Sequence, residues 1–114
     1  MIGVDLIDIK DIPKFNYQNE KRFFKDNFSK KEIDYIKNSS NQQHIAAVLF
    51  SLKESILKCD KFYAGIPFNK INIILKNSSA FHPKFFLSYS NLKNKSILSV
   101  ALAKNYKIIK IENK

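Results

Sequence analysis

The order of apolar and polar residues in the first third of the chain predicts one strand followed by two helices. Residues 2–9 are mainly apolar and β-branched, which favours a strand. Between residues 16 and 37 the apolar residues recur at helical spacing. Ser29 is followed three residues later by Glu32, the pattern of a capping box, and we expect it to begin a second helix that continues through Ile36.

The rest of the chain predicts one long helix and then several strands. We expect the helix at residues 42–59, because apolar side chains recur there at three- and four-residue spacing. Its core face consists of Ile45, Val48, Leu49, Leu52, Ile56 and Cys59. Strand-like segments follow at residues 71–75, 85–90, 97–103 and 107–111, with turns at residues 77–79 and 91–95. This order predicts a single α+β domain over residues 1–114, with an N-terminal strand, helices and then antiparallel strands.

The chain carries a large excess of positive charge, and nearly all of it is lysine. There are 20 Lys and Arg residues against 10 Asp and Glu, a net charge of +10, and Arg22 is the only arginine. Codon bias toward lysine explains such an excess. An anionic partner also explains it, whether a nucleic acid, a phosphorylated cofactor or an acidic protein. Charge alone does not choose between these interpretations.

Cysteine content and the lengths of the apolar runs indicate the cellular compartment in which to expect the protein. Cys59 is the only cysteine, so one chain forms neither an internal disulfide nor a cysteine zinc site. The first residues lack the basic and then apolar pattern of a signal peptide, and no apolar run approaches the ~20 residues of a membrane span. We therefore expect a cytoplasmic protein with no membrane partner.

Charged residues on the long helix and the first strand are the main candidates for chemistry. Glu54 and Lys58 are four residues apart and share one helix face. By itself such a pair is usually a surface ion pair worth ~0.3 kcal/mol. Asp5 interrupts an apolar strand. It either faces solvent at a sheet edge or binds a hard cation, since Mg²⁺ favours one or two carboxylates together with phosphate oxygens and water.

A weaker candidate lies at the end of a predicted strand, where Ser88, Ser90 and Asn91 precede a turn. Such residues normally make turn hydrogen bonds. Their hydroxyl and amide groups are also able to contact a phosphate, so the pattern leaves both interpretations open.

Four segments together resemble the holo-acyl-carrier-protein synthases of the phosphopantetheinyl transferase superfamily, in the family's order. Residues 3–9 are similar to the family's opening Gly-Ile-Asp-Ile-Val-Glu-Ile, and residues 28–32 to its Phe-Thr-x-x-Glu segment. Residues 50–58 resemble the helix motif aromatic-x-x-Lys-Glu-Ala/Ser-x-x-Lys. The Ser-x-Ser of residues 88–90 resembles the family's Ser-x-Ser-His strand.

The resemblance implies a Mg²⁺-dependent enzyme that transfers 4′-phosphopantetheine from coenzyme A to a serine of an apo acyl carrier protein. The other product is adenosine 3′,5′-bisphosphate. Asp5, Glu54 and Lys58 are the implied catalytic residues, with Asp5 and Glu54 as Mg²⁺ ligands. Contacts with coenzyme A are implied for Lys53, Lys58, Gly65, Ser88, Ser90 and Asn91. The group that takes the proton of the serine stays open, as does the pathway of the carrier protein.

The resemblance also implies partners for the basic surface. Acyl carrier proteins are acidic, and the family contacts them with basic residues on its early helix. The candidates here are Lys10, Lys14, Lys21 and Arg22. Short members of the superfamily are homotrimers with active sites between subunits, so the resemblance predicts a homotrimer.

Three departures from the family pattern, together with the lysines interleaved with aromatic residues at 21–25, keep two alternatives open. Asn91 replaces the family's histidine, and Leu49 stands where many relatives carry arginine. The glycine-rich turn after the helix motif is replaced by residues 59–63, with Gly65 further on. One alternative is an inactive relative that still binds a carrier protein. The other is a non-catalytic basic module for nucleic acid or an acidic protein; scarce arginine and the lack of a nucleic-acid motif disfavour the nucleic acid.

Overall fold

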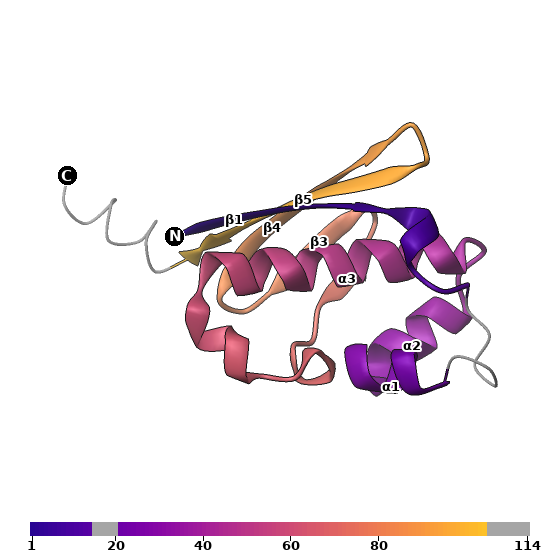
Figure 1. Ribbon diagram of the computed structural model, residues 1–114, viewed down its shortest axis with the longest axis horizontal. Helices are drawn as coiled ribbons and strands as arrows, with labels where there is room; N and C mark the ends of the chain where they lie inside the picture. The colour runs from indigo at the N-terminus through magenta and orange to yellow at the C-terminus, as the bar shows by residue number, and fades with distance from the viewer. Residues whose placement is uncertain (15–20, 105–114) are drawn as a thin grey trace.

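The structure is a computed structural model that describes residues 1–14 and 21–104. A five-stranded antiparallel sheet packs against the long helix α3, and two short helices lie on the opposite side of α3 from the β1–β5 ladder (Figure 1). The strands are β1 (Ile2–Asp8), β2 (Ile74–Lys76), β3 (Ser79–His82), β4 (Phe85–Leu92) and β5 (Ser96–Ala103). The α-helices are α1 (Lys21–Asn27), α2 (Lys30–Lys37) and α3 (Gln42–Cys59). Short 3₁₀ helices are η1 (Ile9–Asp11), η2 (Lys61–Gly65) and η3 (Phe68–Lys70).

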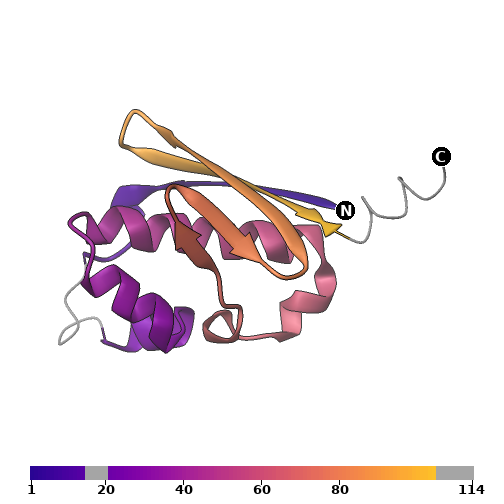
Figure 2. The same cartoon turned by 180° about the vertical axis from the view of Figure 1, so that it is seen from behind.

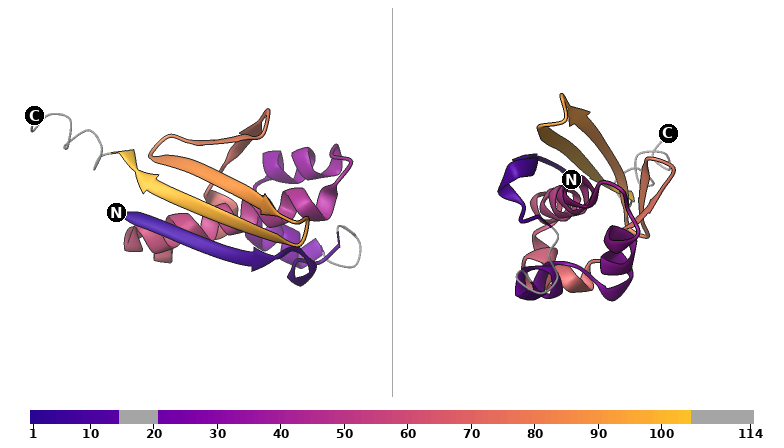
Figure 3. Two further views of the ribbon diagram at one scale, coloured as in Figure 1. Left: turned by 90° about the horizontal axis from the view of Figure 1, so that it is seen from above. Right: turned by 90° about the vertical axis from the view of Figure 1, so that its right-hand side faces the viewer.

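The sheet brings the first strand beside the last. Its strand order is β1-β5-β4-β3-β2, and every neighbouring pair is antiparallel. Strands β1 and β5 run side by side (Figure 3), and Asp5 lies opposite Ser99 in their ladder. The α+β fold with an N-terminal strand, helices and antiparallel strands is thus confirmed.

The long helix and the capping box agree with the sequence pattern. Helix α3 begins and ends where the apolar periodicity predicts. Ser29 caps α2, with its hydroxyl accepting from the backbone of Glu32 and the Glu32 side chain accepting from the backbone of Ser29. The expected helical residues 16–20 and strand residues 107–111 lie outside the described residues.

Two details of the predicted strands are wrong. The strand expected at residues 71–75 pairs only at Ile74–Lys76 (β2), and an unexpected strand, β3, follows the turn. Asn77 and Ser78 have positive φ angles of 51° and 64° and form a tight turn that joins β2 to β3 (Figure 2). A short hairpin therefore replaces the longer single strand.

The core lies between α3 and the inner face of the sheet and continues under the two short helices. Its fully buried members from α3 and the sheet include Val48, Leu52, Ile56, Ile97 and Ala101. Phe24, Phe28 and Ile36 extend it beneath α1 and α2. This packing fixes α3 against β1 and β5, the elements that carry the candidate site.

The outer face of the sheet is apolar and exposed. Ile2, Val4 and Leu6 point outward from β1 and are 61%, 48% and 60% exposed. They pair with Leu102, Val100 and Leu98 of β5, so one apolar surface crosses both strands. In the described part of the chain, no helix has the length and apolar character that crossing a membrane would require.

Candidate active site

Asp5 lies in the middle of β1, on the face that packs against α3. It is only 7% exposed, although β1 is an edge strand. The interpretation of Asp5 as a solvent-facing edge residue is therefore wrong. A buried carboxylate requires a cation or hydrogen-bond donors, so the partners of Asp5 define the site.

Gly3 allows β1 to approach α3 closely enough for Asp5 to reach the helix. A Cβ at position 3 would lie 1.9 Å from the carbonyl oxygen of Ser55 and 2.5 Å from the backbone nitrogen of Cys59. Both atoms belong to the α3 backbone, which cannot move aside without breaking the helix. Glycine is the residue that fits here.

Both oxygens of the Asp5 carboxylate are occupied. Lys58 Nζ donates to Oδ1 at 2.8 Å, and the Ser51 hydroxyl donates to Oδ2 at 3.2 Å. The Lys58 side chain is 52% exposed, so Oδ1 faces a solvent-accessible cation while Oδ2 faces the interior. Among the described residues Lys58 pairs with Asp5, and the surface ion pair with Glu54 is not formed.

Glu54 belongs to the same electrostatic unit. It lies on α3 one turn before Lys58, half-buried. Burial raises the pKa of Glu54, the negative charge of Asp5 raises it further, and the Lys58 ammonium lowers it. The hydrogen bond to Asp5 and then the charge of Asp5 raise the pKa of Lys58 most. Burial opposes them, and the charge of Glu54 adds a smaller increase. Two carboxylates and one ammonium therefore act on each other.

This donor set fits a hard cation such as Mg²⁺. Two neighbouring carboxylates repel each other and attract positive charge, and the Lys58 ammonium supplies part of that charge. Mg²⁺ is typically held by one or two carboxylates, with water and phosphate oxygens completing its shell. The described residues contain no group of three or more His, Cys, Asp or Glu able to hold a metal, so a site made only of protein ligands is not present there.

Lys53 is buried away from this site. Its side chain is 0% exposed and its ammonium donates to the Glu32 carboxylate and to the carbonyls of Asn27 and Phe68. The three donors of the ammonium are thereby used. The contact with coenzyme A expected of Lys53 would break these bonds, so the structure gives this residue an internal role.

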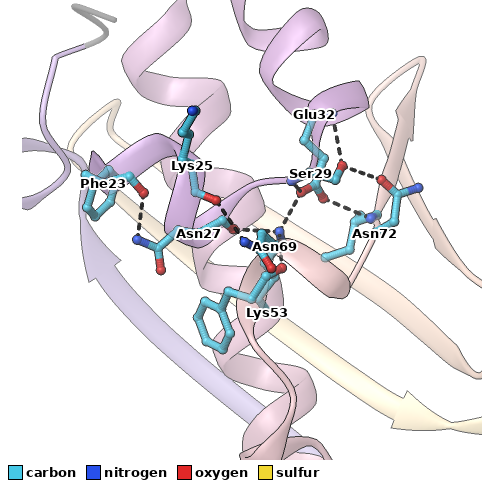
Figure 4. Close-up of polar contacts among 10 residues, drawn as sticks. Phe23, Lys25, Asn27, Ser29, Glu32, Lys53, Asn69 and Asn72 are labelled. Atoms are coloured by element: carbon cyan, nitrogen blue, oxygen red, sulfur yellow. Dashed lines mark hydrogen bonds and ion pairs between the residues drawn. The ribbon is translucent and has the colours of Figure 1, made fainter. Parts of the chain in front are cut away.

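The Lys53 network joins three elements (Figure 4). Asn27 ends α1, Glu32 belongs to the first turn of α2, and Phe68 lies in η3. Glu32 also accepts from the backbone nitrogen of Ile73 at 2.9 Å. The network therefore fixes the two short helices and the segment before β2 relative to α3.

Ser88, Ser90 and Asn91 do not meet Asp5 within one chain. Ser88 and Ser90 are exposed on the outer face of β4, whereas Asp5 faces inward from β1 on the far side of β5. Asn91 is exposed and donates to Asn94 Oδ1 at 2.7 Å. These side chains reach a site that contains Asp5 only if a second copy brings them there.

Gly65 and the basic candidates are exposed. Gly65 ends η2 after α3, and a Cβ there would contact nothing within 4 Å. Lys10, Lys14, Lys21 and Arg22 are all exposed near η1 and the start of α1. Arg22 makes an ion pair of 3.7 Å with Asp26 on the next turn.

Sequence reasoning missed the hydroxyl groups beneath Asp5. Ser51, Ser55 and Ser99 are each 0% exposed and contact one another between α3 and β5. Small polar residues at core positions give no distinct sequence signal, although Ser51 and Ser55 flank Glu54 within the helix motif.

The cavities lie elsewhere. The most apolar one, of about 290 Å³, lies between α2, α3 and β2 and is lined by residues such as Tyr35, Leu49 and Ile73. None of five cavities formed by the described residues is lined by Asp5, Glu54 or Lys58. The charged cluster therefore lies outside these five cavities.

Comparisons with known proteins agree with the fold. A curated holo-[acyl-carrier-protein] synthase from Thermodesulfovibrio yellowstonii is 27% identical over 110 residues, covering 89% of this chain and 96% of the relative. The crystal structure of the Thermotoga maritima holo-[acyl-carrier-protein] synthase superposes with a TM-score of 0.70 at 14% identity, covering 90% of this chain and 61% of that one. The Helicobacter pylori holo-[acyl-carrier-protein] synthase, solved in complex with coenzyme A, gives a TM-score of 0.66 at 22% identity and covers 91% and 100%.

At sequence identities of 14% and 22%, the structural likenesses establish the fold alone. The sequence model of the 4′-phosphopantetheinyl transferase superfamily matches residues 1–108, nearly the whole chain. This chain belongs to the 4′-phosphopantetheinyl transferase superfamily and has the fold of its holo-[acyl-carrier-protein] synthases.

Proposed function

We propose that this protein transfers 4′-phosphopantetheine from coenzyme A to a serine of an apo acyl carrier protein, with Mg²⁺ bound by Asp5 and Glu54. The observation that carries the proposal is the cluster of Asp5, Glu54 and Lys58, held together on β1 and α3 within the fold of this family. The names of the relatives support the proposed substrates: all three are holo-[acyl-carrier-protein] synthases, and one of them was solved in complex with coenzyme A.

In the proposed reaction the serine Oγ of the carrier protein forms a bond to the β-phosphorus of coenzyme A. The bond from that phosphorus to the leaving phosphate breaks, and adenosine 3′,5′-bisphosphate departs with the electron pair. The proton of the serine is released to solvent, which balances the reaction. Bound Mg²⁺ would neutralise the pyrophosphate and stabilise the charge that develops in transfer.

The roles of the side chains follow from their surroundings. The raised pKa of Lys58 keeps its ammonium protonated at neutral pH, where it is able to donate to a phosphate oxygen. Its exposed side chain leaves that group accessible. Asp5 and Glu54 supply negative charge at the position where the cation is needed. Lys53 stabilises the fold around them and has no proposed contact with the cofactor.

We also propose that the working form is a homotrimer with the site between subunits. The outward positions of Ser88 and Ser90 support this, because only another copy is able to bring them to the side of Asp5. The apolar outer face at Ile2, Val4 and Leu6 supports it as well, since apolar area of this kind favours association.

The proposed partner is an acidic carrier protein in the cytoplasm. Lys10, Lys14, Lys21 and Arg22 are exposed on one stretch of chain, where complementary charge would raise the association rate and orient the encounter. The buried free thiol of Cys59 is compatible with a reducing compartment.

The test is the intact mass of an apo acyl carrier protein after incubation with this protein, Mg²⁺ and coenzyme A. We expect a gain of one phosphopantetheine, abolished by EDTA and restored by added Mg²⁺. A carrier protein that binds but gains no mass would identify an inactive relative. Neither binding nor mass gain would contradict the proposed function altogether.

A further inference from the structure

We propose that Ser51, Ser55 and Ser99 form a one-directional chain of hydroxyl donors that orients Asp5 for cation binding, an inference that rests on the proposed function. The serines lie directly beneath Asp5. Ser51 and Ser55 are one turn apart on α3, and Ser99 lies opposite Asp5 on β5. All three are 0% exposed.

The hydroxyl groups are not required by packing. Fully buried small positions on the same two elements are alanine, at Ala46 and Ala47 on α3 and Ala101 on β5. Burying a hydroxyl is unfavourable unless the hydroxyl is hydrogen-bonded, and an alanine avoids this penalty. Three serines that contact one another here therefore have a polar role.

Their hydrogen bonds are continuous and end on the carboxylate. Ser55 Oγ lies 2.5 Å from Ser99 Oγ, and Ser99 Oγ lies 2.7 Å from Ser51 Oγ. Ser99 Oγ is also 2.9 Å from the carbonyl oxygen of Ser51. Ser51 Oγ lies 3.2 Å from Asp5 Oδ2.

Counting protons gives this chain a direction. Each hydroxyl has one proton, and an ionised carboxylate only accepts. The proton of Ser51 therefore points to Asp5. Ser99 must then donate its own proton to Ser51, whose hydroxyl and carbonyl oxygens both accept it. The remaining contact, between Ser55 and Ser99, uses the proton of Ser55. Every donor points toward Asp5, an order in which each bond strengthens the next.

The result is an Asp5 carboxylate with one fixed oxygen and one available oxygen. Ser51 holds Oδ2 on the interior side, which sets the rotation of the carboxylate. Oδ1 then points to the accessible side, where Lys58 now supplies positive charge. Ser51 is a positioning residue in contact with the ligand atom, Ser99 acts through Ser51, and Ser55 acts through Ser99.

The test compares Mn²⁺ affinity, measured by the paramagnetic resonance of free Mn²⁺ with coenzyme A present and no carrier protein, so that no transfer occurs. We expect Ser51→Ala to weaken Mn²⁺ binding by about 10- to 100-fold, the usual effect of losing a residue that supports a metal ligand. Ser99→Ala should weaken it less and Ser55→Ala least, following their order along the chain. Ser99→Thr, which keeps the hydroxyl, should bind more tightly than Ser99→Ala.

The matched control is Ser96→Ala. Ser96 also lies on β5 and donates to an aspartate of β1, Asp8, at 2.9 Å, but at the surface. Its removal should leave Mn²⁺ affinity unchanged. The melting temperature of each variant is measured as well. Weaker Mn²⁺ binding at an unchanged melting temperature indicates a changed orientation of Asp5 and not a general loss of packing.

Two outcomes would overturn the inference, and they differ. If the wild-type protein binds Mn²⁺ and Ser51→Ala binds it equally well, the hydroxyl chain has no role in orientation while the proposed function stands. If the wild-type protein itself does not bind Mn²⁺, the cation site at Asp5 and Glu54 is wrong, and the proposed function fails with it.

Discussion

Lys53 and Lys58 belong to one helix motif, yet they lie in different surroundings and have different proposed roles. Lys53 is buried against Glu32 and stabilises the junction of three elements. Lys58 is half-exposed and holds its charge beside Asp5. At the scale of single residues, burial distinguishes the lysine with a structural role from the lysine proposed to act in catalysis.

Substitution of the two lysines by methionine should separate stability from activity. Lys53→Met leaves the Glu32 carboxylate buried without its cation, which should lower the free energy of unfolding by about 3–5 kcal/mol. Lys58→Met takes the ammonium away from Asp5, which keeps the Ser51 hydroxyl as a donor, so it should lower the free energy of unfolding by less than Lys53→Met. It should transfer phosphopantetheine about 100-fold more slowly, the usual effect of losing one charge-stabilising donor. Urea denaturation and the transfer rate per folded molecule measure both effects. Equal stability of the two variants would contradict the assigned roles.

Resemblance to the family predicted Asp5, Glu54 and Lys58 as one site, and the structure brings them together. The local pattern of residues did not predict that Lys58 pairs with Asp5 instead of Glu54. Such a pairing depends on how closely β1 packs on α3, which is a tertiary property. The internal partners of Lys53 were not predicted for the same reason, because its burial depends on η3 and α1 rather than on the helix that carries it.

At the scale of elements, the packing of β1 on α3 decides whether the site exists. Gly3→Ala would place a methyl group within 1.9 Å of a helix carbonyl, so β1 has to move. We expect a loss of about 1–3 kcal/mol of stability, as for other overpacked sites, together with weaker Mn²⁺ binding. Gly65→Ala is the control, because the space at that position is open. Wild-type stability and Mn²⁺ binding in Gly3→Ala would contradict the account of this contact.

The β3–β4 hairpin should be sensitive to acid through His82. Burial lowers the pKa of His82 below its ordinary 6.5, and the positive charges of Lys104 and Lys84 lower it further. Its Nδ1 also accepts from the backbone nitrogen of Lys84, a bond that the protonated ring loses. The unfolded chain therefore binds this proton more tightly than the folded one. Stability from neutral His82 is complete above pH 6.5 and is lost as pH falls through the lowered pKa.

Melting temperatures recorded from about pH 8 to about pH 5 test this linkage. His82→Asn keeps an acceptor for the Lys84 backbone without a titrating group, so its melting temperature should fall less on acidification than that of the wild-type protein. His44 also has a pKa lowered by burial and is present in both proteins. Identical slopes in the two proteins would show that His82 does not contribute.

Element prediction succeeded where a pattern is long and failed where it is short. The α3 region has a periodic apolar face over many turns, so both ends were predicted correctly. Strand β3 has only four residues and begins at the end of the turn predicted at residues 77–79, too short for a pattern of its own. Ile73 is apolar and was assigned to a strand, but its backbone donates to Glu32 and does not pair with another strand. Tertiary contacts, absent from local sequence, determine such short segments.

At the scale of the whole molecule, the proposed homotrimer depends on the outer sheet face. Val4, Val100 and Ser88 form a row across it from β1 to β4. Val4→Lys puts a charge into this surface and should shift sedimentation from trimer toward monomer, with loss of transfer activity. Tyr35→Lys changes a residue of similar exposure on α2 and should stay trimeric. A wild-type protein that sediments as a monomer at micromolar concentration would contradict the proposed assembly.

The most direct test of the central claim is the transfer rate of Glu54→Gln, measured by the mass gain of an apo acyl carrier protein with Mg²⁺ and coenzyme A. Gln keeps the shape of Glu54 and removes its charge, and Asp34→Asn removes an exposed carboxylate of α2 as a control. We expect the control to match the wild-type protein and Glu54→Gln to be slower by about 100-fold or more. Near-normal transfer by Glu54→Gln would contradict a catalytic cation site built from Asp5 and Glu54.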